Sequence, residues 1–262
     1  MHSYWQKQSS TSPLFPDIEW NKPEQKTRAG KLAIIGGNKL SFVATATAYQ
    51  EASTIGAGQV RVVLPDALKP VIPATILDAV YGDSTPAGSL GKDSLATVQS
   101  SMAWADHVLF IGDAGRNSET AMLYETLLAS PGAITVTRDA VDLLKHVTPK
   151  LLDRPDTTLV VSFAQLQKLF QGVYYPKMLS FAMQINLLVE ILHKFTITYP
   201  VTIVTYHQNQ LLIAHDGNVI TQEFEQPMMI WRGSVATAIA CYQLWTPKKP
   251  LESTTTAVFS LA

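Results

Sequence analysis

The chain has 262 residues, of which 47% are hydrophobic and 16% are charged, and its formal net charge is −1. This apolar content can bury a sizeable core, and the low charge content excludes an intrinsically disordered chain. A nearly neutral chain lacks the basic surface that binds nucleic acid or anionic membranes, so we expect neither partner. The single cysteine, Cys241, excludes an internal disulfide framework and multi-thiolate metal sites. We expect a cytoplasmic protein, because no secretory signal or membrane span is visible.

Residues 1–30 are predicted to form a polar N-terminal arm, and residues 31–262 a single domain. The arm contains Pro13, Pro16 and Pro23, and a proline ring neither donates a backbone hydrogen bond nor sits inside a helix. We therefore expect an extended lead-in.

From Lys31 onward, short apolar runs alternate with longer segments of mixed character, which predicts an α/β fold with crossover helices between strands. The runs are nearly continuous in Val, Ile and Leu, as expected for parallel strands buried on both faces. We predict strands at Lys31–Gly36, Gln59–Leu64, His107–Ile111, Ala133–Thr137, Thr158–Val161 and Val201–Thr205.

Six segments between and after these strands are predicted to be helical. They are Phe42–Ile55, Ser118–Ala129, Asp139–His146, Ala164–Phe170, Lys177–Phe195 and Ser234–Trp245. In Lys177–Phe195, apolar residues from Met178 and Phe181 to Leu192 recur at spacings of three and four, so they should form one stripe against the sheet.

A hairpin is predicted near the end of the sheet. Leu211–Ala214 and Asn218–Thr221 flank Asp216 and Gly217, and an Asp-Gly pair supplies the positive φ of a tight turn. We expect this antiparallel extension to close one edge of the sheet.

Two glycine-containing turns, Gly36-Gly37-Asn38 and Gly112–Arg116, follow predicted strands. The carboxyl ends of parallel strands share one edge of a sheet, where α/β proteins bind ligands. By itself such a turn is more often a simple tight connection than a ligand site. Arg232-Gly233-Ser234 precedes the last helix, whose first N–H groups could hold a phosphate, although Ser234 could also be an ordinary N-cap. The six histidines show no metal-ligand spacing, so we predict no metal site formed by histidine.

Four segments follow one another with a characteristic spacing. They are Lys31-Leu-Ala-Ile-Ile-Gly-Gly-Asn38 with Ala44, Gly56-Ala-Gly58-Gln-Val-Arg-Val-Val-Leu-Pro65, Ala105-Asp-His-Val-Leu-Phe-Ile-Gly112 with Gly115-Arg116, and Thr137-Arg-Asp139-Ala-Val. In this order they resemble the ADP-dependent NAD(P)H-hydrate dehydratase family of the ribokinase-like superfamily. The resemblance covers residues 31–262 and implies a three-layer sandwich, with a mostly parallel sheet between two layers of helices.

The resemblance also implies a reaction that repairs damaged nicotinamide nucleotides. ADP or ATP, with Mg²⁺ as a possible companion, phosphorylates the ring hydroxyl of hydrated NADH or NADPH, and phosphate then leaves. By this resemblance, substrate would contact Ala44, Gly115, Asp139 and Ser162. Nucleotide would contact Gly233 together with Tyr206, His207, Gln208, Asn209 and Gln210. We expect these small molecules as partners, and a homo-oligomer.

Two family motifs differ in this chain, at three positions. The family's catalytic aspartate falls on Ser234, its substrate-contacting histidine falls on Ser162, and the glutamate that follows falls on Gln165. A serine with no recognisable base beside it cannot take up a proton near neutral pH, so we expect impaired chemistry. The alternatives are a catalytically degenerate relative that binds nucleotide or serves assembly, and a small-molecule kinase of the same superfamily.

Overall fold

A computed structural model describes residues 3–72 and 75–262, and its centre is one ten-stranded sheet. The strand order is β1-β10-β9-β8-β7-β6-β5-β2-β3-β4. The strands are β1 (Trp5–Gln8), β2 (Lys31–Gly36), β3 (Gln59–Pro65), β4 (Ala79–Gly82), β5 (His107–Gly112), β6 (Ala133–Thr137), β7 (Thr157–Val161), β8 (Val201–His207), β9 (Gln210–His215) and β10 (Asn218–Glu223). All neighbouring pairs from β8 to β4 are parallel, and β2 pairs directly with β5.

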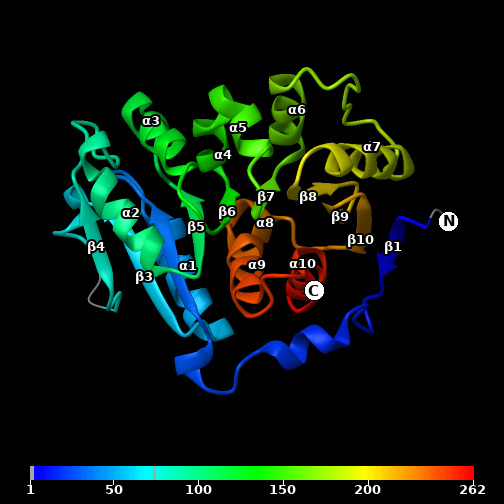
Figure 1. Cartoon of the computed structure of the whole chain (residues 1–262), viewed down its shortest axis with the longest axis horizontal. Helices are drawn as coiled ribbons and strands as arrows, with labels where there is room; N and C mark the ends of the chain where they lie inside the picture. Colours follow the sequence, from blue (N-terminus) through cyan, green and yellow to red (C-terminus); the bar gives the residue numbers. More distant parts are fainter. Residues whose placement is uncertain (1–2, 73–74) are drawn as a thin grey trace.

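Helices cover both faces of the sheet (Figure 1). They are α1 (Val43–Ile55), α2 (Leu95–Trp104), α3 (Ser118–Leu127), α4 (Asp139–Leu143), α5 (Thr148–Leu152), α6 (Phe163–Gly172), α7 (Ile185–Thr198), α8 (Met228–Arg232), α9 (Ser234–Trp245) and α10 (Pro250–Phe259). One apolar core lies under α2–α7, and a second under α1 and α8–α10. The predicted three-layer α/β sandwich is confirmed. No helix among the described residues is long and apolar enough to cross a membrane.

All six strand predictions are confirmed to within two residues, and five of the six helix predictions hold with small shifts at their ends. The sequence patterns did not indicate α2, β4, β1 or α10. Strands β1 and β4 have four residues each, which is too few for the alternation of apolar and polar side chains that would indicate a strand.

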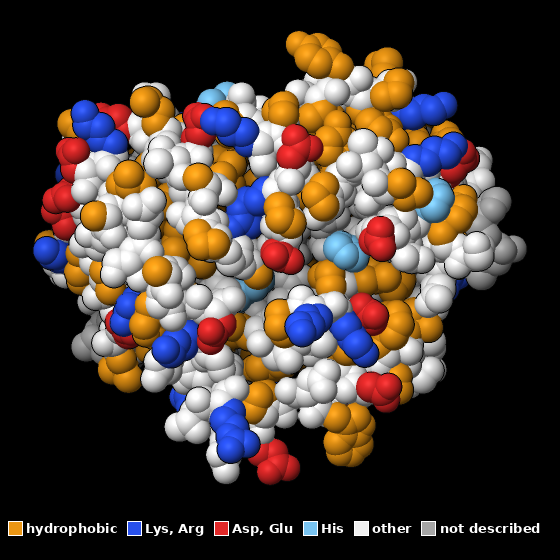
Figure 2. Space-filling model, in the orientation of Figure 1, with side chains coloured by type: hydrophobic (Ala, Val, Ile, Leu, Met, Phe, Trp, Pro, Cys, Tyr) orange, Lys and Arg blue, Asp and Glu red, His pale blue; other side chains and the backbone are white. Residues whose placement is uncertain are grey.

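The prediction of a helix from Lys177 is wrong, because α7 begins at Ile185. The carbonyl of Met183 instead accepts hydrogen bonds from His207 Nε2 at 2.7 Å and Gln208 Nε2 at 3.0 Å. Hydrogen bonds from the end of β8 and the β8–β9 turn thus take the place of the hydrogen bonds that the Met183 carbonyl would make within a helix. Met178 is 90% exposed and Phe181 is 64% exposed, so neither joins the predicted stripe. Figure 2 shows hydrophobic side chains gathered on the surface over α6 and the α6–α7 connection.

The predicted hairpin is present, with Asp216 and Gly217 at φ values of 44° and 71° between β9 and β10. It does not form the edge of the sheet, however. The N-terminal arm returns to add β1 beside β10 in parallel, and Trp5 Nε1 donates to Thr221 Oγ1 at 3.0 Å. The arm then passes below α9 and α10 toward β2 (Figure 1), and its 3-10 turn Pro16–Asn21 contacts α10. It therefore adds an edge strand and packs on a helix, rather than forming a simple lead-in.

Candidate functional site

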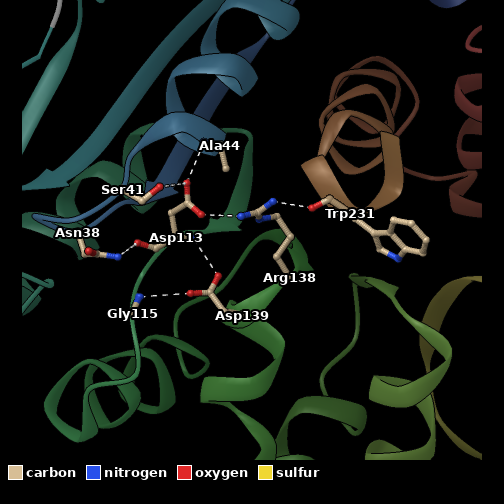
Figure 3. Close-up of polar contacts among 8 residues, drawn as sticks. All are labelled: Asn38, Ser41, Ala44, Asp113, Gly115, Arg138, Asp139 and Trp231. Carbon is tan, nitrogen blue, oxygen red and sulfur yellow. Dashed lines mark hydrogen bonds and ion pairs between the residues drawn. The ribbon is translucent and has the colours of Figure 1, made fainter. Parts of the chain in front are cut away.

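Asp113 is the centre of a polar cluster at the carboxyl ends of β2, β5 and β6 (Figure 3). Its carboxylate accepts a hydrogen bond from Ser41 Oγ at 3.0 Å and another from the backbone N–H of Ala44 at 2.9 Å. The same carboxylate pairs with Arg138 Nη2 at 2.5 Å. Asp113 therefore caps the first turn of α1 from a distant part of the chain, and it fixes that helix to β5 and β6.

Arg138 joins β6 to α8, because its Nη1 donates to the carbonyl oxygen of Trp231 at 2.5 Å. Its backbone has φ 56° and ψ −141°, a conformation that costs a non-glycine residue about 1–3 kcal/mol. Its Nε is buried and has no hydrogen-bond partner in the described structure. A strained backbone and an unpaired buried donor are both features that concentrate at functional sites.

Asp139 shapes the glycine turn that follows β5. Its two carboxylate oxygens accept the backbone N–H groups of Asp113 at 2.8 Å and Gly115 at 3.2 Å. Burial raises the pKa of Asp139 above its ordinary value, and the two backbone hydrogen bonds counteract part of that rise. Gly112 has φ +97°, and a Cβ there would overlap Asp139 Oδ1, so both the turn conformation and the close approach require glycine.

Two cavities adjoin at Asp139. One, of about 350 Å³, lies between the ends of β6 and β7, α6 and the indole of Trp231. The other, of about 420 Å³, lies between the loop before α3, with Arg116, and the segment after α4, with Lys145. Asp139, Asp142 and Lys168 line both cavities, which makes them one cleft with two chambers.

Ser162 lines the first chamber, and its polar groups cap the N-terminus of α6. Its hydroxyl accepts the backbone N–H of Gln165 at 3.2 Å, while Gln165 Oε1 accepts the backbone N–H of Ser162 at 3.1 Å. This reciprocal pair is a capping box. Gln165 Nε2 also donates to the carbonyl of Arg138 at 2.7 Å, which links α6 to the strained residue.

Ser234 is the first residue of α9, and Gly233, at φ +98°, is its N-cap, so the prediction of Ser234 as an ordinary N-cap is wrong. The expectation that no base stands beside Ser234 is also wrong. Its hydroxyl donates to Glu51 Oε1 of α1 at 2.6 Å. Burial raises the pKa of Glu51, and the hydrogen bond from Ser234 opposes that rise.

The segment Tyr206–Gln210 forms the turn between β8 and β9. Gln208 and Asn209 have φ values of 47° and 61°, while His207 is buried and its ring stacks on Phe163 with centroids 4.6 Å apart. No hydrogen bond or ion pair among the described residues connects this turn with Gly233, Ser234 or Asp139. The structure therefore places Gly115, Asp139 and Ser162 in the lining of one cleft. Ala44 does not line it and is linked to this region through its hydrogen bond to Asp113, and the turn stays separate from it.

Sequence reasoning missed Asp113, Arg138, Trp231 and Glu51 as members of this site. Asp113 and Arg138 stand inside the turns that the motifs identified, but their positive φ values and mutual pairing are tertiary properties. Glu51 is 183 residues from Ser234, and one acidic residue in an alanine-rich helix gives no local signal.

No protein-family model matches the chain, and no curated protein matches it. Solved structures do. A ribokinase-like superfamily protein from Enterococcus faecalis has a TM-score of 0.73 and 16% identity, over 100% of this chain and 88% of that one. An ADP/ATP-dependent NAD(P)H-hydrate dehydratase from Bacillus subtilis, crystallised with ATP and Mg²⁺ and soaked with CoA, has a TM-score of 0.62 and 13% identity, over 95% and 87% of the two chains.

A phosphomethylpyrimidine kinase from Clostridium difficile has a TM-score of 0.55 and 10% identity, over 88% of this chain and 98% of that one. Identities this low bear on the fold and not on the activity. The TM-scores over nearly the whole chain, together with the mostly parallel sheet between two helical layers, establish that this chain has a ribokinase-like fold.

Proposed function

We propose that the protein binds a nucleotide together with hydrated NADH or NADPH in the two-chambered cleft, and acts as an ADP- or ATP-dependent NAD(P)H-hydrate dehydratase. The observation that carries this proposal is the pair of chambers, of about 350 and 420 Å³, that share Asp139, Asp142 and Lys168. A phosphoryl transfer between two small molecules requires two adjoining subsites. Each chamber lies within the roughly 300–1,000 Å³ range of small-molecule pockets.

The charges of the cleft suit ligands that carry phosphate. Arg138 borders the first chamber, Arg116 and Lys145 border the second, and Lys168 borders both. Guanidinium and ammonium groups bind phosphate oxygens through charge-assisted hydrogen bonds. Arg116 and Lys145 form no ion pair within the described residues, whereas Lys168 is paired with Asp142 at 3.0 Å.

Mg²⁺ would accompany the nucleotide rather than occupy a site built by the protein. No group of three or more His, Cys, Asp or Glu side chains in residues 3–72 and 75–262 could hold a metal ion. Mg²⁺ commonly keeps several waters and binds through substrate phosphates. The proposal therefore assigns no step to a metal held by this chain.

A second candidate is a relative that binds nucleotide without turnover, or that serves only assembly. It is favoured by Ser162 and Gln165, whose polar groups are occupied with capping α6. A small-molecule kinase is the third candidate. Homo-oligomerisation, the cytoplasmic location, and the lack of nucleic-acid and membrane partners stay predictions.

The proposal is tested by calorimetry with ADP, ATP, NADH and NADPH, and by the return of dihydronicotinamide absorbance when the protein is given hydrated NADH with ADP or ATP. Trp231, which is 48% exposed in the first chamber, should stack on a ligand ring, a contact worth about 1–3 kcal/mol. Trp231→Ala should therefore weaken binding at least about fivefold. Trp20→Ala, which removes an 87% exposed indole outside the cleft, is the matched control.

Each of the other outcomes has a distinct meaning. Binding without the return of absorbance would support the degenerate relative. Nucleotide consumption with another hydroxyl acceptor, but not with the hydrate, would support a kinase. If none of the four ligands binds at millimolar concentration, the proposed function is wrong and a role in assembly gains support.

A further inference from the structure

Arg138 lines the first chamber, but its guanidinium is bound by the protein itself. Nη2 pairs with the Asp113 carboxylate at 2.5 Å, and Nη1 donates to the Trp231 carbonyl at 2.5 Å (Figure 3). The Asp113 side chain is less exposed than that of Arg138, and it lines neither chamber. The cation therefore borders the chamber, while the carboxylate that neutralises it stands outside.

Arg138 is incompletely satisfied in this pairing. A guanidinium carries five N–H donors, and it pairs most strongly with a carboxylate or phosphate through two parallel hydrogen bonds. The ion pair with Asp113 uses Nη2, and the buried Nε has no hydrogen-bond partner in the described structure. A phosphate supplies more acceptor oxygens than the Asp113 carboxylate supplies here, so it can pair more completely with the same guanidinium.

Both cations that line the first chamber already have a carboxylate partner. Lys168 pairs with Asp142 at 3.0 Å, but both of these side chains are solvent-exposed, so water screens that pair. Arg138 is less exposed than Lys168 and is therefore the cation whose charge water screens less. An anion that enters the chamber gains the charge of Arg138 only by drawing the guanidinium away from Asp113.

Asp113 can lose Arg138 without being left unpaired. Its carboxylate also accepts hydrogen bonds from Ser41 Oγ at 3.0 Å and from the backbone N–H of Ala44 at 2.9 Å. Ala44 lies in the first turn of α1, a helix of 13 residues, and the N-terminal end of a helix stabilises a negative charge. The exchange of Arg138 from Asp113 to a ligand thus leaves each of the three groups with a partner.

We propose that Asp113 is an internal competitor for Arg138, and that the phosphate of a ligand in the first chamber takes the guanidinium from it. This inference rests on the proposed function, because it names the side chain of the first chamber that binds the phosphate of the ligand. When Arg138 turns toward that phosphate it releases the Trp231 carbonyl, which changes the surroundings of the indole in the same chamber.

Calorimetry with ADP and with inorganic pyrophosphate tests the exchange. Asp113→Asn removes the competing charge but keeps an acceptor oxygen for the start of α1, so it should bind both probes at least about threefold more tightly than the wild type. Arg138→Gln should weaken binding at least about tenfold. Asp78→Asn is the matched control: it removes the carboxylate that pairs with Arg61 at 3.1 Å outside both chambers, and should leave both affinities unchanged.

Tryptophan fluorescence gives a second readout, made on the wild type and so independent of how well Asp113→Asn folds. Pyrophosphate should change the emission of the wild type. Trp231→Phe, which keeps the backbone carbonyl, should remove that change, and so should Arg138→Gln. A purely structural ion pair predicts no such signal.

The outcomes separate this inference from the proposed function. If Asp113→Asn binds the probes no more tightly than the wild type, or if Arg138→Gln binds them equally well, the exchange is overturned while hydrate-dependent turnover still supports the proposed function. If Asp113→Asn binds more tightly but the wild type never returns the dihydronicotinamide absorbance, the exchange stands and the dehydratase activity does not. If neither the wild type nor Asp113→Asn binds either probe at millimolar concentration, both are overturned.

Discussion

Replacing Asp113 with alanine tests whether the cluster in Figure 3 holds the sheet edge together. The carboxylate is only 11% exposed, and its removal deletes two hydrogen bonds, to Ser41 and Ala44, together with the ion pair to Arg138. Removing one partner of a fully buried ion pair costs about 3–5 kcal/mol. The Arg138 side chain is 26% exposed, so water can solvate part of its charge and the cost is smaller. We expect a loss of about 2–4 kcal/mol in the free energy of unfolding.

A chain of this size loses about 2–3 °C of Tm per kcal/mol, so Asp113→Ala should lower Tm by about 4–12 °C. Urea denaturation and differential scanning calorimetry measure the two quantities. Asp113→Asn, which keeps one acceptor oxygen but no charge, should give an intermediate loss. The exposed Asp93, in the 3-10 turn Lys92–Ser94, provides the control variant Asp93→Ala.

The explanation fails if Asp113→Ala stays within about 0.5 kcal/mol of the wild type, or if Asp93→Ala loses as much. A loss of stability in Asp113→Asn equal to that in the alanine variant would show that charge, rather than the hydrogen bonds, carries the whole effect.

Three further predictions concern stability. In urea denaturation, Gly112→Ala should lower the free energy of unfolding several times more than Gly132→Ala. Both glycines have φ near +100°, but only a Cβ at position 112 would overlap Asp139 Oδ1, so equal losses of stability would contradict this explanation. Burial lowers the pKa of His107 from 6.5 to about 3, so the folded protein should lose about 2 kcal/mol of stability between pH 7.5 and pH 5, as the unfolded chain takes up the proton. His107→Gln should remove that part of the pH dependence, and an unchanged slope would refute the assignment. Ser162→Ala should lower stability by about 1 kcal/mol through loss of the α6 cap, and an unchanged midpoint in thermal unfolding would contradict that role.

The α/β class, the strands β2, β3 and β5–β8, and most of the helices that alternate with them could be predicted from local sequence patterns. These strands are continuous apolar runs, and a run buried on both faces can be recognised without knowing its neighbours. The Asp216-Gly217 hairpin was equally local, because the turn depends on the φ values that two adjacent residues adopt. The positions of the glycine turns after β2 and β5 followed from the same local rules.

Tertiary structure alone decided where the polar groups meet. Asp113 caps a helix 69 residues away, and Glu51 reaches Ser234 across 183 residues, so neither partnership leaves a periodic trace in the sequence. The start of α7 depends on His207, at the end of β8, donating a hydrogen bond to the Met183 carbonyl. The outer edge of the sheet depends on the pairing of β1 with β10. A helix or strand can form from neighbouring residues, whereas these features arise only once distant segments pack together.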